Sequence, residues 1–327
     1  MRYVARRLGF FVVTLWACVT INFVLPRIMP GDPAIDMMSQ YKGQISEGTY
    51  HAMALALGTD THTNLALAYV EYLGNTLTGH FGTSITQFPD SVVSVVASAL
   101  PWTIGLVGLT TVLAFVLGTL IGMAGAWRRG GRLDSLLPPI FVVTSAFPYF
   151  WVALVFVLFF AIEVHWLPGE FGYAPSSQIS LSWGFIGDVL DHAVLPAVSL
   201  LVTSIGGWIL TMRNNMITVL SEDYVAMARA AGLSSRRIML DYAGRNAILP
   251  NLTGFAMSLG FVVSGAVLVE YVFNYPGVGF LLLRAVESGD YALMQALFLL
   301  ITVCVLVAVL LVDFVTVLAD PRTRTES

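Results

Sequence analysis

The stretch that decides the fold is residues 222–250, EDYVAMARAAGLSSRRIMLDYAGRNAILP, a polar segment between two long apolar segments. Its first part, Glu222–Ala231, has helix-forming composition, with acids at the beginning that suit a helix N-terminus. Gly232 can end this helix, and Ser234 or Ser235 can cap a second one. The stretch therefore predicts a helix, a tight corner and a short basic amphipathic helix. A rigid polar knob of this kind suits the docking of a partner protein; a solvated loop is the alternative.

The remainder of the chain has the composition of an integral membrane protein. Of its 327 residues, 57% are hydrophobic and only 11% are charged, whereas a soluble domain carries roughly 25% charged residues. Cys18 and Cys304 both fall in apolar segments and fit neither a disulfide framework nor a metal-ligand cluster. Nothing in the composition supports binding to nucleic acid.

Six segments are long enough to span a bilayer core of about 30 Å, which takes roughly 20 apolar residues in a helix. They are Leu8–Ile28, Leu100–Ala126, Leu136–Ile162, His192–Met212, Ile248–Val272 and Leu293–Leu318. The first is too long for the apolar part of a signal peptide, and no convincing cleavage site follows it, so we expect a retained anchor. The sequence thus predicts an all-α integral membrane protein with six transmembrane helices.

Lysine and arginine positions predict the orientation of these spans. With the N-terminus inside, only Arg27, Lys42 and Arg284 lie outside, and the other thirteen of the sixteen basic residues lie inside. Both termini are therefore expected in the cytoplasm. The predicted organisation is a cytoplasmic N-terminus, a first span, a long extracytoplasmic loop, a five-helix core with an inner loop at 213–249, and a cytoplasmic tail; the ranges are 1–7, 8–28, 29–99, 100–320 and 321–327.

The polar stretch resembles the EAA loop of ABC-importer permeases, the loop that docks into the ATPase subunit. In the generic motif a glycine follows an Ala-rich turn, and Leu-Pro closes the loop. Here the turn is Ala226-Met227-Ala228, the glycine is Gly232, and Leu249-Pro250 follows. Ala226 stands where the generic motif has glutamate, and the Leu-Pro lies farther away. Both features resemble the dipeptide, oligopeptide and nickel permease subfamily.

Further matches to that subfamily extend along nearly the whole chain. Pro30-Gly31-Asp32-Pro33-Ala34 resembles the start of its first outer loop, and Gly82-Thr83-Ser84 its later Gly-x-Ser, although His80 stands where an acid is usual. The string from Phe273 to Gly279, FNYPGVG, also resembles the subfamily. In the long outer loop, Glu47–Leu57 and Asn64–Leu77 are predicted to form short helices.

The resemblance implies the six-helix bundle of a type I ABC-importer permease in the plasma (inner) membrane of a prokaryote. The implied partners are a second homologous permease, two ABC ATPase subunits, an extracytoplasmic substrate-binding protein and membrane lipid. The expected ATPase-coupling residues are Ala226, Ala228, Arg229, Ala230, Gly232, Leu233, Arg236 and Arg237. The residues expected to face the binding protein are Asp32, Gly82, Asn274, Pro276 and Gly277.

No constellation for catalysis, a metal or a cofactor is expected. The five histidines lack ligand spacing, and the only lysine, Lys42, precedes Gly43 rather than the Ser or Thr of a phosphate-binding loop. Transporters driven by protons or sodium place ionisable groups at membrane depth. Here Glu163 and Glu270 are expected only near outer ends, and Asp313 near an inner end. We therefore expect the energy for transport to come from ATP hydrolysis on separate subunits.

The sequence leaves the solute open. The first hypothesis is that the transporter imports di- or oligopeptides. The alternatives are that the same kind of transporter imports an oligosaccharide or, less favoured, nickel. Alternatives of another class are an intramembrane enzyme and a passive channel or scaffold. Small polar residues within the spans are candidates to line an aqueous path: Thr110, Thr111, Ser145, Ser199, Thr203 and Ser204.

Overall fold

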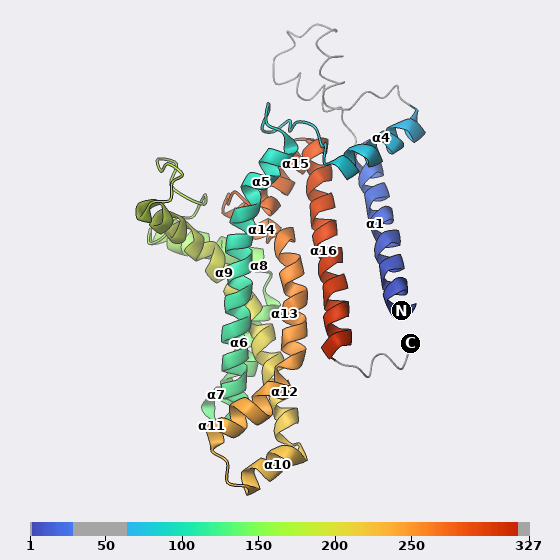
Figure 1. The fold of residues 1–327 in the computed structure, drawn as a ribbon. Helices are drawn as coiled ribbons and strands as arrows, with labels where there is room; N and C mark the ends of the chain where they lie inside the picture. The colour runs from blue at the N-terminus through green and yellow to red at the C-terminus, as the bar shows by residue number, and fades with distance from the viewer. Residues whose placement is uncertain (1, 29–63, 320–327) are drawn as a thin grey trace.

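Helices dominate this computed structural model, which describes residues 2–28 and 64–319. Within those ranges the only β-type pairing is an isolated bridge between Thr83 and Ser91. The predicted all-α fold is therefore confirmed. Figure 1 shows an elongated bundle of long helices, with α1 to one side beyond α16 and a knob of short helices at the lower end.

Four helical stretches in the described ranges are individually long and apolar enough to cross a membrane. They are α1 (Arg2–Ile28), the continuous run of α5 (Val92–Thr103), η1 (Ile104–Gly108) and α6 (Leu109–Trp127), then α9 (Trp183–Leu220) and α16 (Tyr291–Ala319). Each contains one of the predicted spans. Four of the six predicted spans therefore coincide with continuous helices.

The third predicted span, Leu136–Ile162, is bent sharply rather than continuous. α7 (Arg132–Ala146) meets α8 (Tyr149–Phe156), which continues into the π-helical η2 (Val157–Glu163), at an angle of 89°. The bend lies at Pro148, because a proline disfavours the helical conformation of the residue before it. The preceding residue is indeed extended, with φ −83° and ψ 133°.

The fifth predicted span, Ile248–Val272, is also interrupted. α13 (Leu249–Phe261) tightens into the 3-10 turn η4 (Val262–Ser264), and the chain then turns at Gly265 before α14 (Val267–Val272). Gly265 has φ +68°, a conformation that residues with a Cβ rarely adopt. The apolar run is therefore divided into a long helix and a short one that lies outside the apolar spans.

The fourth predicted span, His192–Met212, is the middle part of a longer helix. α9 runs over 38 residues, from Trp183 to Leu220, and the side chain of Ser182 caps it by accepting a hydrogen bond from the Phe185 N–H. At about 1.5 Å per residue the helix is roughly 57 Å long. A bilayer core is about 30 Å thick, so α9 extends well beyond it.

α9 packs closely along α6, and two glycines make the close approach possible. A Cβ on Gly118 would lie 2.5 Å from the Cβ of Trp208, and one on Gly122 would collide with the carbonyl oxygen of Ile209. Glycines four residues apart on one helix let a second backbone approach. The α6–α9 pair is therefore the tightly packed spine of the bundle.

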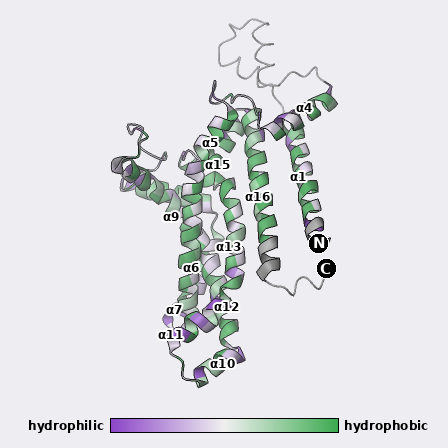
Figure 2. Ribbon diagram, in the orientation of Figure 1, coloured by the Kyte–Doolittle hydropathy of each residue, from purple (hydrophilic) through white to green (hydrophobic). Residues whose placement is uncertain are grey.

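The two ends of the bundle differ in polarity and composition. At the upper end, α15 (Val278–Glu287) packs its buried residues against α5 and the beginning of α16. Figure 2 shows that hydrophilic residues gather at the lower end, around α11 and α12.

Of the two helices predicted in the long outer loop, the one at Asn64–Leu77 is observed as α4 (Leu65–Thr78), which the Asn64 side chain caps. The other, at 47–57, lies outside the described residues.

Candidate functional site: the polar knob and the outer anchors

The polar knob at the lower end is built from residues 222–250 and has the predicted helix–corner–helix form. α10 (Asp223–Ala230) comes first. A second helical segment follows, composed of α11 (Ser235–Arg237), the π-helical η3 (Ile238–Gly244) and α12 (Arg245–Ala247). This second segment meets the following apolar helix, α13, at 52°. The knob is thus a structured pair of helices rather than an irregular loop.

The corner between the two helices depends on Gly232. Its N–H donates to the carbonyl oxygen of Arg229 at 3.0 Å, and the Leu233 N–H donates to that of Ala228 at 3.2 Å. This is the hydrogen-bond pattern of a Schellman motif, whose central residue is left-handed. Gly232 has φ +75°, so glycine meets the conformational requirement of the corner.

An apolar interior fixes the knob to the spine of the bundle. Val225, Ala228 and Ile238 are buried together, against Trp127 at the end of α6 and Leu220 at the end of α9. Burial of apolar surface contributes roughly 25 cal/mol per Å² to this packing. The knob therefore moves with the lower ends of α6 and α9.

A second set of contacts joins the later knob helices to the same two spine helices. Ala243 and Ala247 are buried against Met123 of α6 and Met212 of α9. Gly244 lies close to the same surface, since a Cβ there would be 3.0 Å from the Met123 Cε. Both knob helices are thereby packed against one rigid support.

Most of the predicted coupling residues are exposed on the knob. Ala228 is buried, Leu233 is half-buried, and six are exposed: Ala226, Arg229, Ala230, Gly232, Arg236 and Arg237. Met227 is 72% exposed between two of the small residues. The arrangement presents small side chains, one large apolar side chain and several guanidinium groups on a rigid surface.

An ion pair next to the knob joins α7 to α9. The Arg213 Nε donates to Asp134 Oδ1 at 2.6 Å, and the Gly130 N–H donates to the other carboxylate oxygen at 2.9 Å. Both charged side chains are largely buried. This pair ties the bent α7–α8 segment to the same spine that supports the knob.

A buried carboxylate, that of Glu270 in α14, organises the upper end. Glu270 is fully buried. Its Oε1 accepts from Thr103 Oγ1 at 2.9 Å, and its Oε2 accepts from the N–H groups of Gly279 at 2.8 Å and Phe280 at 3.2 Å. These donors include the first turn of α15, where a helix dipole favours negative charge. Burial raises the pKa of the Glu270 carboxyl, and the three hydrogen bonds oppose that shift.

This cluster explains the Pro-Gly-Val-Gly string and removes Gly277 from the predicted outer surface. Gly277 is buried, and a Cβ there would collide with the Glu270 carboxylate. Asn274, with φ +46°, and Pro276 are half-buried beside it. Gly82 is exposed, with φ +78°. Asp32 lies outside the described residues.

A second buried carboxylate, Asp290, anchors the outer segment that contains Gly82-Thr83-Ser84. Its Oδ2 accepts from Ser84 Oγ at 2.6 Å, Ile85 N–H at 2.8 Å, Thr86 N–H at 3.0 Å and Thr86 Oγ1 at 2.8 Å. Its Oδ1 accepts from the Leu293 N–H at 3.1 Å, which caps α16. One side chain therefore holds the turn at 84–86 onto the beginning of the last long helix.

Replacing Asp290 with alanine is expected to release this turn while leaving the bundle assembled. Hydrogen bonds to a charged group are each worth roughly 1.5–3 kcal/mol, so the loss raises the open population of the turn at least about tenfold. Hydrogen–deuterium exchange measures this at the amides of Ile85 and Thr86. Asp90→Ala is the matched control, because its side chain is exposed on the same loop; equal exchange in both variants would contradict the anchoring role.

An open cavity of about 460 Å³ lies at the bend between α7 and α8. Ser145, Phe147 and Pro148 line it from the bent pair, and Thr203 and Ser204 line it from α9. Three of the six residues predicted to line an aqueous path thus meet here. Thr110 and Ser199 are buried elsewhere, and they donate their hydroxyl groups to backbone carbonyl oxygens four residues earlier, as Ser204 also does.

Sequence reasoning missed the buried carboxylates and the Asp134–Arg213 pair. The capping role of Asp290 could have been predicted, because an acid immediately before a long apolar run is a good helix cap. No local pattern in the sequence indicates the partners of Glu270, Asp134 or Arg213. Within the described ranges, no three His, Cys, Asp or Glu side chains gather closely enough to hold a metal ion.

Comparison with known proteins gives a family and several relatives of similar length. Residues 114–325 match the model of the family described as "Binding-protein-dependent transport system inner membrane component". The chain is 32% identical to the di/tripeptide transport system permease protein DppB of Pseudomonas aeruginosa, over 99% of each chain. It is 31% identical to the oligopeptide transport system permease protein OppB of Haemophilus influenzae, again over 99% of each. It is 28% identical to the oligopeptide transport system permease protein AppB of Bacillus subtilis, over 98% of each. The chain therefore belongs to the family of inner membrane components of binding-protein-dependent transport systems.

Proposed function

We propose that this chain imports di- or oligopeptides as one permease subunit of an ATP-driven transporter. The observation that carries the proposal is the rigid knob, whose exposed small and basic face is fixed to the ends of α6 and α9. Relatives that are named peptide permeases match the chain from end to end, and this supports peptides as the solute.

Family membership already separates the roles of the subunits. The chain is a multi-pass component of the inner membrane, and it works with an ATPase and a substrate-binding protein, so ATP is hydrolysed on a separate subunit. We propose in addition that it pairs with a second homologous permease and that the complex contains two ATPase subunits. The proposed orientation places the knob and both termini in the cytoplasm, in agreement with the excess of arginine on that side.

The proposed mechanism is mechanical. Closure of the ATPases displaces the face formed by Ala226, Arg229, Ala230, Gly232, Arg236 and Arg237, together with the adjoining Ala228 and Leu233. Because the knob is packed on α6 and α9, the displacement tilts the spine, and the bent α7–α8 segment follows through the Arg213–Asp134 pair. The cavity beside Ser145 and Thr203 is the proposed part of the peptide path in this chain.

On the outer side, we propose that the turn around Gly82 and the half-buried Asn274 and Pro276 contribute to the surface that meets the binding protein. The support is their position above the two buried carboxylates, Glu270 and Asp290, which hold these segments in place. Asp32 remains part of the same proposal on the ground of its sequence motif alone.

The test of the docking role is co-purification of the ATPase from detergent-solubilised membranes. Arg236→Glu/Arg237→Glu reverses two exposed charges on the knob and is expected to reduce ATPase recovery at least about tenfold. Placing like charges opposite each other across an interface costs several kcal/mol. A tenfold loss of binding corresponds to only about 1.4 kcal/mol, so tenfold is the smallest reduction expected. Dipeptide uptake is expected to fall in parallel.

The matched control is Arg132→Glu, which reverses an exposed charge at the start of α7, outside the knob. It is expected to retain the ATPase. Recovery of normal amounts of ATPase with the double variant would refute the docking role. Normal docking with uptake of an oligosaccharide or nickel, but not of dipeptides, would refute the proposed solute while leaving the machinery intact.

A further inference from the structure

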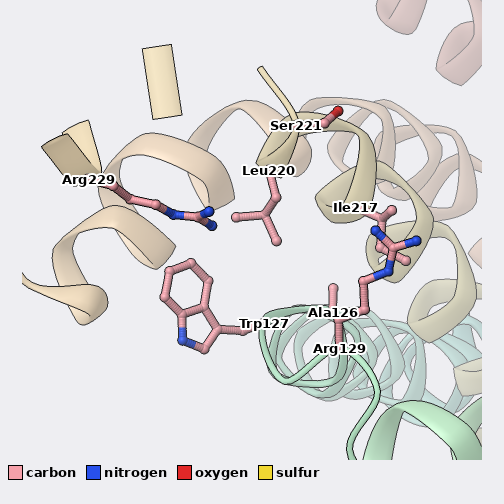
Figure 3. Close-up of a pocket in the computed structure, with 7 residues that line it drawn as sticks. All are labelled: Ala126, Trp127, Arg129, Ile217, Leu220, Ser221 and Arg229. Carbon is pink, nitrogen blue, oxygen red and sulfur yellow. The ribbon is translucent and has the colours of Figure 1, made fainter. Parts of the chain in front are cut away.

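A cavity of about 260 Å³ opens between the lower ends of α6 and α9 and the helix α10. Figure 3 shows the side chains of Trp127, Leu220 and Arg229 facing one another across one part of it, with Arg129 beside Ile217 on the other side. Pockets for drug-sized molecules measure roughly 300–1,000 Å³. This one is smaller, and it therefore fits a compact group rather than a transported peptide.

The cavity contains two guanidinium groups whose charges are not balanced locally. Among the described residues, neither Arg129 nor Arg229 forms an ion pair. Asp134 is near enough to interact electrostatically with Arg129, but its carboxylate oxygens are already bound by Arg213 and the Gly130 N–H. The acid in the first turn of α10 lies at the opposite end of that helix from Arg229. Both side chains are exposed, so the cavity has the charge and the access to receive an anion.

The surroundings of the two arginines indicate where that anion comes from. Ile217 and Leu220 continue the apolar surface of a membrane-spanning helix into the cavity, and Trp127 lies at the end of another. Tryptophan is enriched at membrane–water interfaces. Basic pockets between transmembrane helices on the cytoplasmic side bind acidic lipid headgroups.

We propose that this cavity binds the phosphate headgroup of an anionic phospholipid, with Arg129 and Arg229 as the donors. A guanidinium donates two parallel hydrogen bonds to a phosphate, which gives a geometric fit as well as charge neutralisation. The inference rests on the orientation in the proposed function, which puts the cavity on the cytoplasmic side of the membrane. Since Arg229 belongs to α10, a bound lipid holds the knob helix against the ends of the spine.

The experiment measures phospholipid retained by the full-length chain together with its co-purified partner subunits. The complex is reconstituted into nanodiscs of phosphatidylcholine and phosphatidylglycerol, extracted into detergent and analysed by native mass spectrometry. Wild type is expected to retain phosphatidylglycerol in preference to phosphatidylcholine. Retention is expected to fall about fivefold for each arginine removed, in Arg129→Gln and again in Arg129→Gln/Arg229→Gln.

The control is Arg128→Gln/Arg132→Gln, which removes the same charge from two positions near Arg129 that do not line the cavity. Equal losses in the control and the pocket variants would overturn the proposal, because the attraction would then be nonspecific. An excess of inorganic phosphate is the competitor. If it displaces the lipid completely at millimolar concentration, the site takes a soluble phosphate, and the lipid source is refuted.

Recovery of the ATPase is recorded in the same samples, which separates this inference from the proposed function. If every variant retains the ATPase and the same amount of phosphatidylglycerol, the lipid site is refuted and the docking role stands. If Arg129→Gln loses the ATPase without losing lipid, the cavity receives a partner protein, and the lipid site is again refuted. If wild type recovers no ATPase but retains the lipid selectively, the proposed function fails and the lipid site survives.

Discussion

Glu270→Leu is expected to lower the free energy of unfolding by about 2–5 kcal/mol, because it leaves buried donors without an acceptor. The Thr103 hydroxyl and the N–H groups of Gly279 and Phe280 all donate to this carboxylate. Leucine has a similar volume but accepts no hydrogen bond. The first turn of α15 therefore loses the group that neutralises its N–H donors, and the contact between α5 and α15 is weakened.

The measurement is the thermal midpoint of the detergent-purified complex, followed by loss of the monodisperse peak in size-exclusion chromatography. Glu270→Gln is expected to fall between wild type and leucine, since the amide oxygen still accepts from the two N–H groups. Glu287→Leu is the control, because that carboxylate is exposed and accepts one hydrogen bond, from the Tyr271 hydroxyl at 2.7 Å, within the part of the chain that the structure describes. Equal thermal midpoints for Glu270→Leu and Glu287→Leu would contradict the anchoring role of Glu270.

Gly122→Leu is expected to prevent assembly of the spine. Even a Cβ at this position collides with the Ile209 carbonyl oxygen and lies 3.0 Å from the Met212 Cβ. Overpacking a core costs typically about 1–3 kcal/mol when side chains can move aside. Here the obstacle is the backbone of α9, so the cost exceeds that range and the yield of folded protein falls severely.

The yield of monodisperse protein after mild solubilisation measures the effect. Gly207→Leu on α9 is the matched control, since among the described residues no atom beyond its chain neighbours and its own helix backbone lies within 4 Å of a Cβ there. We expect it to give a wild-type yield. Should Gly122→Leu purify as well as the control, the close approach of α6 and α9 would not be required for folding.

The features that could be predicted from the sequence are those set by near neighbours in the chain. The corner at Gly232 depends on bonds to Ala228 and Arg229, and the composition of residues 222–250 contains all of them. The apolar runs likewise define where helices cross the membrane. The exposed residues of the knob lie in the same stretch, whereas Ala228, one of the residues proposed for docking, is buried.

The features that escaped prediction depend on partners far away in the chain. Glu270 is bound by Thr103, 167 residues away, and Asp290 by Ser84, 206 residues away. No local pattern distinguishes such an acid from one in a solvated loop. The ends of α9 were missed for a different reason, because polar residues such as Asp188 and Asp191 resemble a loop in a hydropathy profile but do not end a helix.

Because α9 is continuous, it fixes the rotation of its two ends relative to each other as well as the distance between them. The outer end of this helix carries Asp188, whose carboxylate accepts hydrogen bonds from the Ala174 N–H and the Ser177 hydroxyl. Its inner end leads directly into α10. Inserting one residue between them would turn one end by about 100° relative to the other and shift it by roughly 1.5 Å. The number of residues in this one helix therefore sets the angle between the segment bound at its outer end and the knob at its inner end.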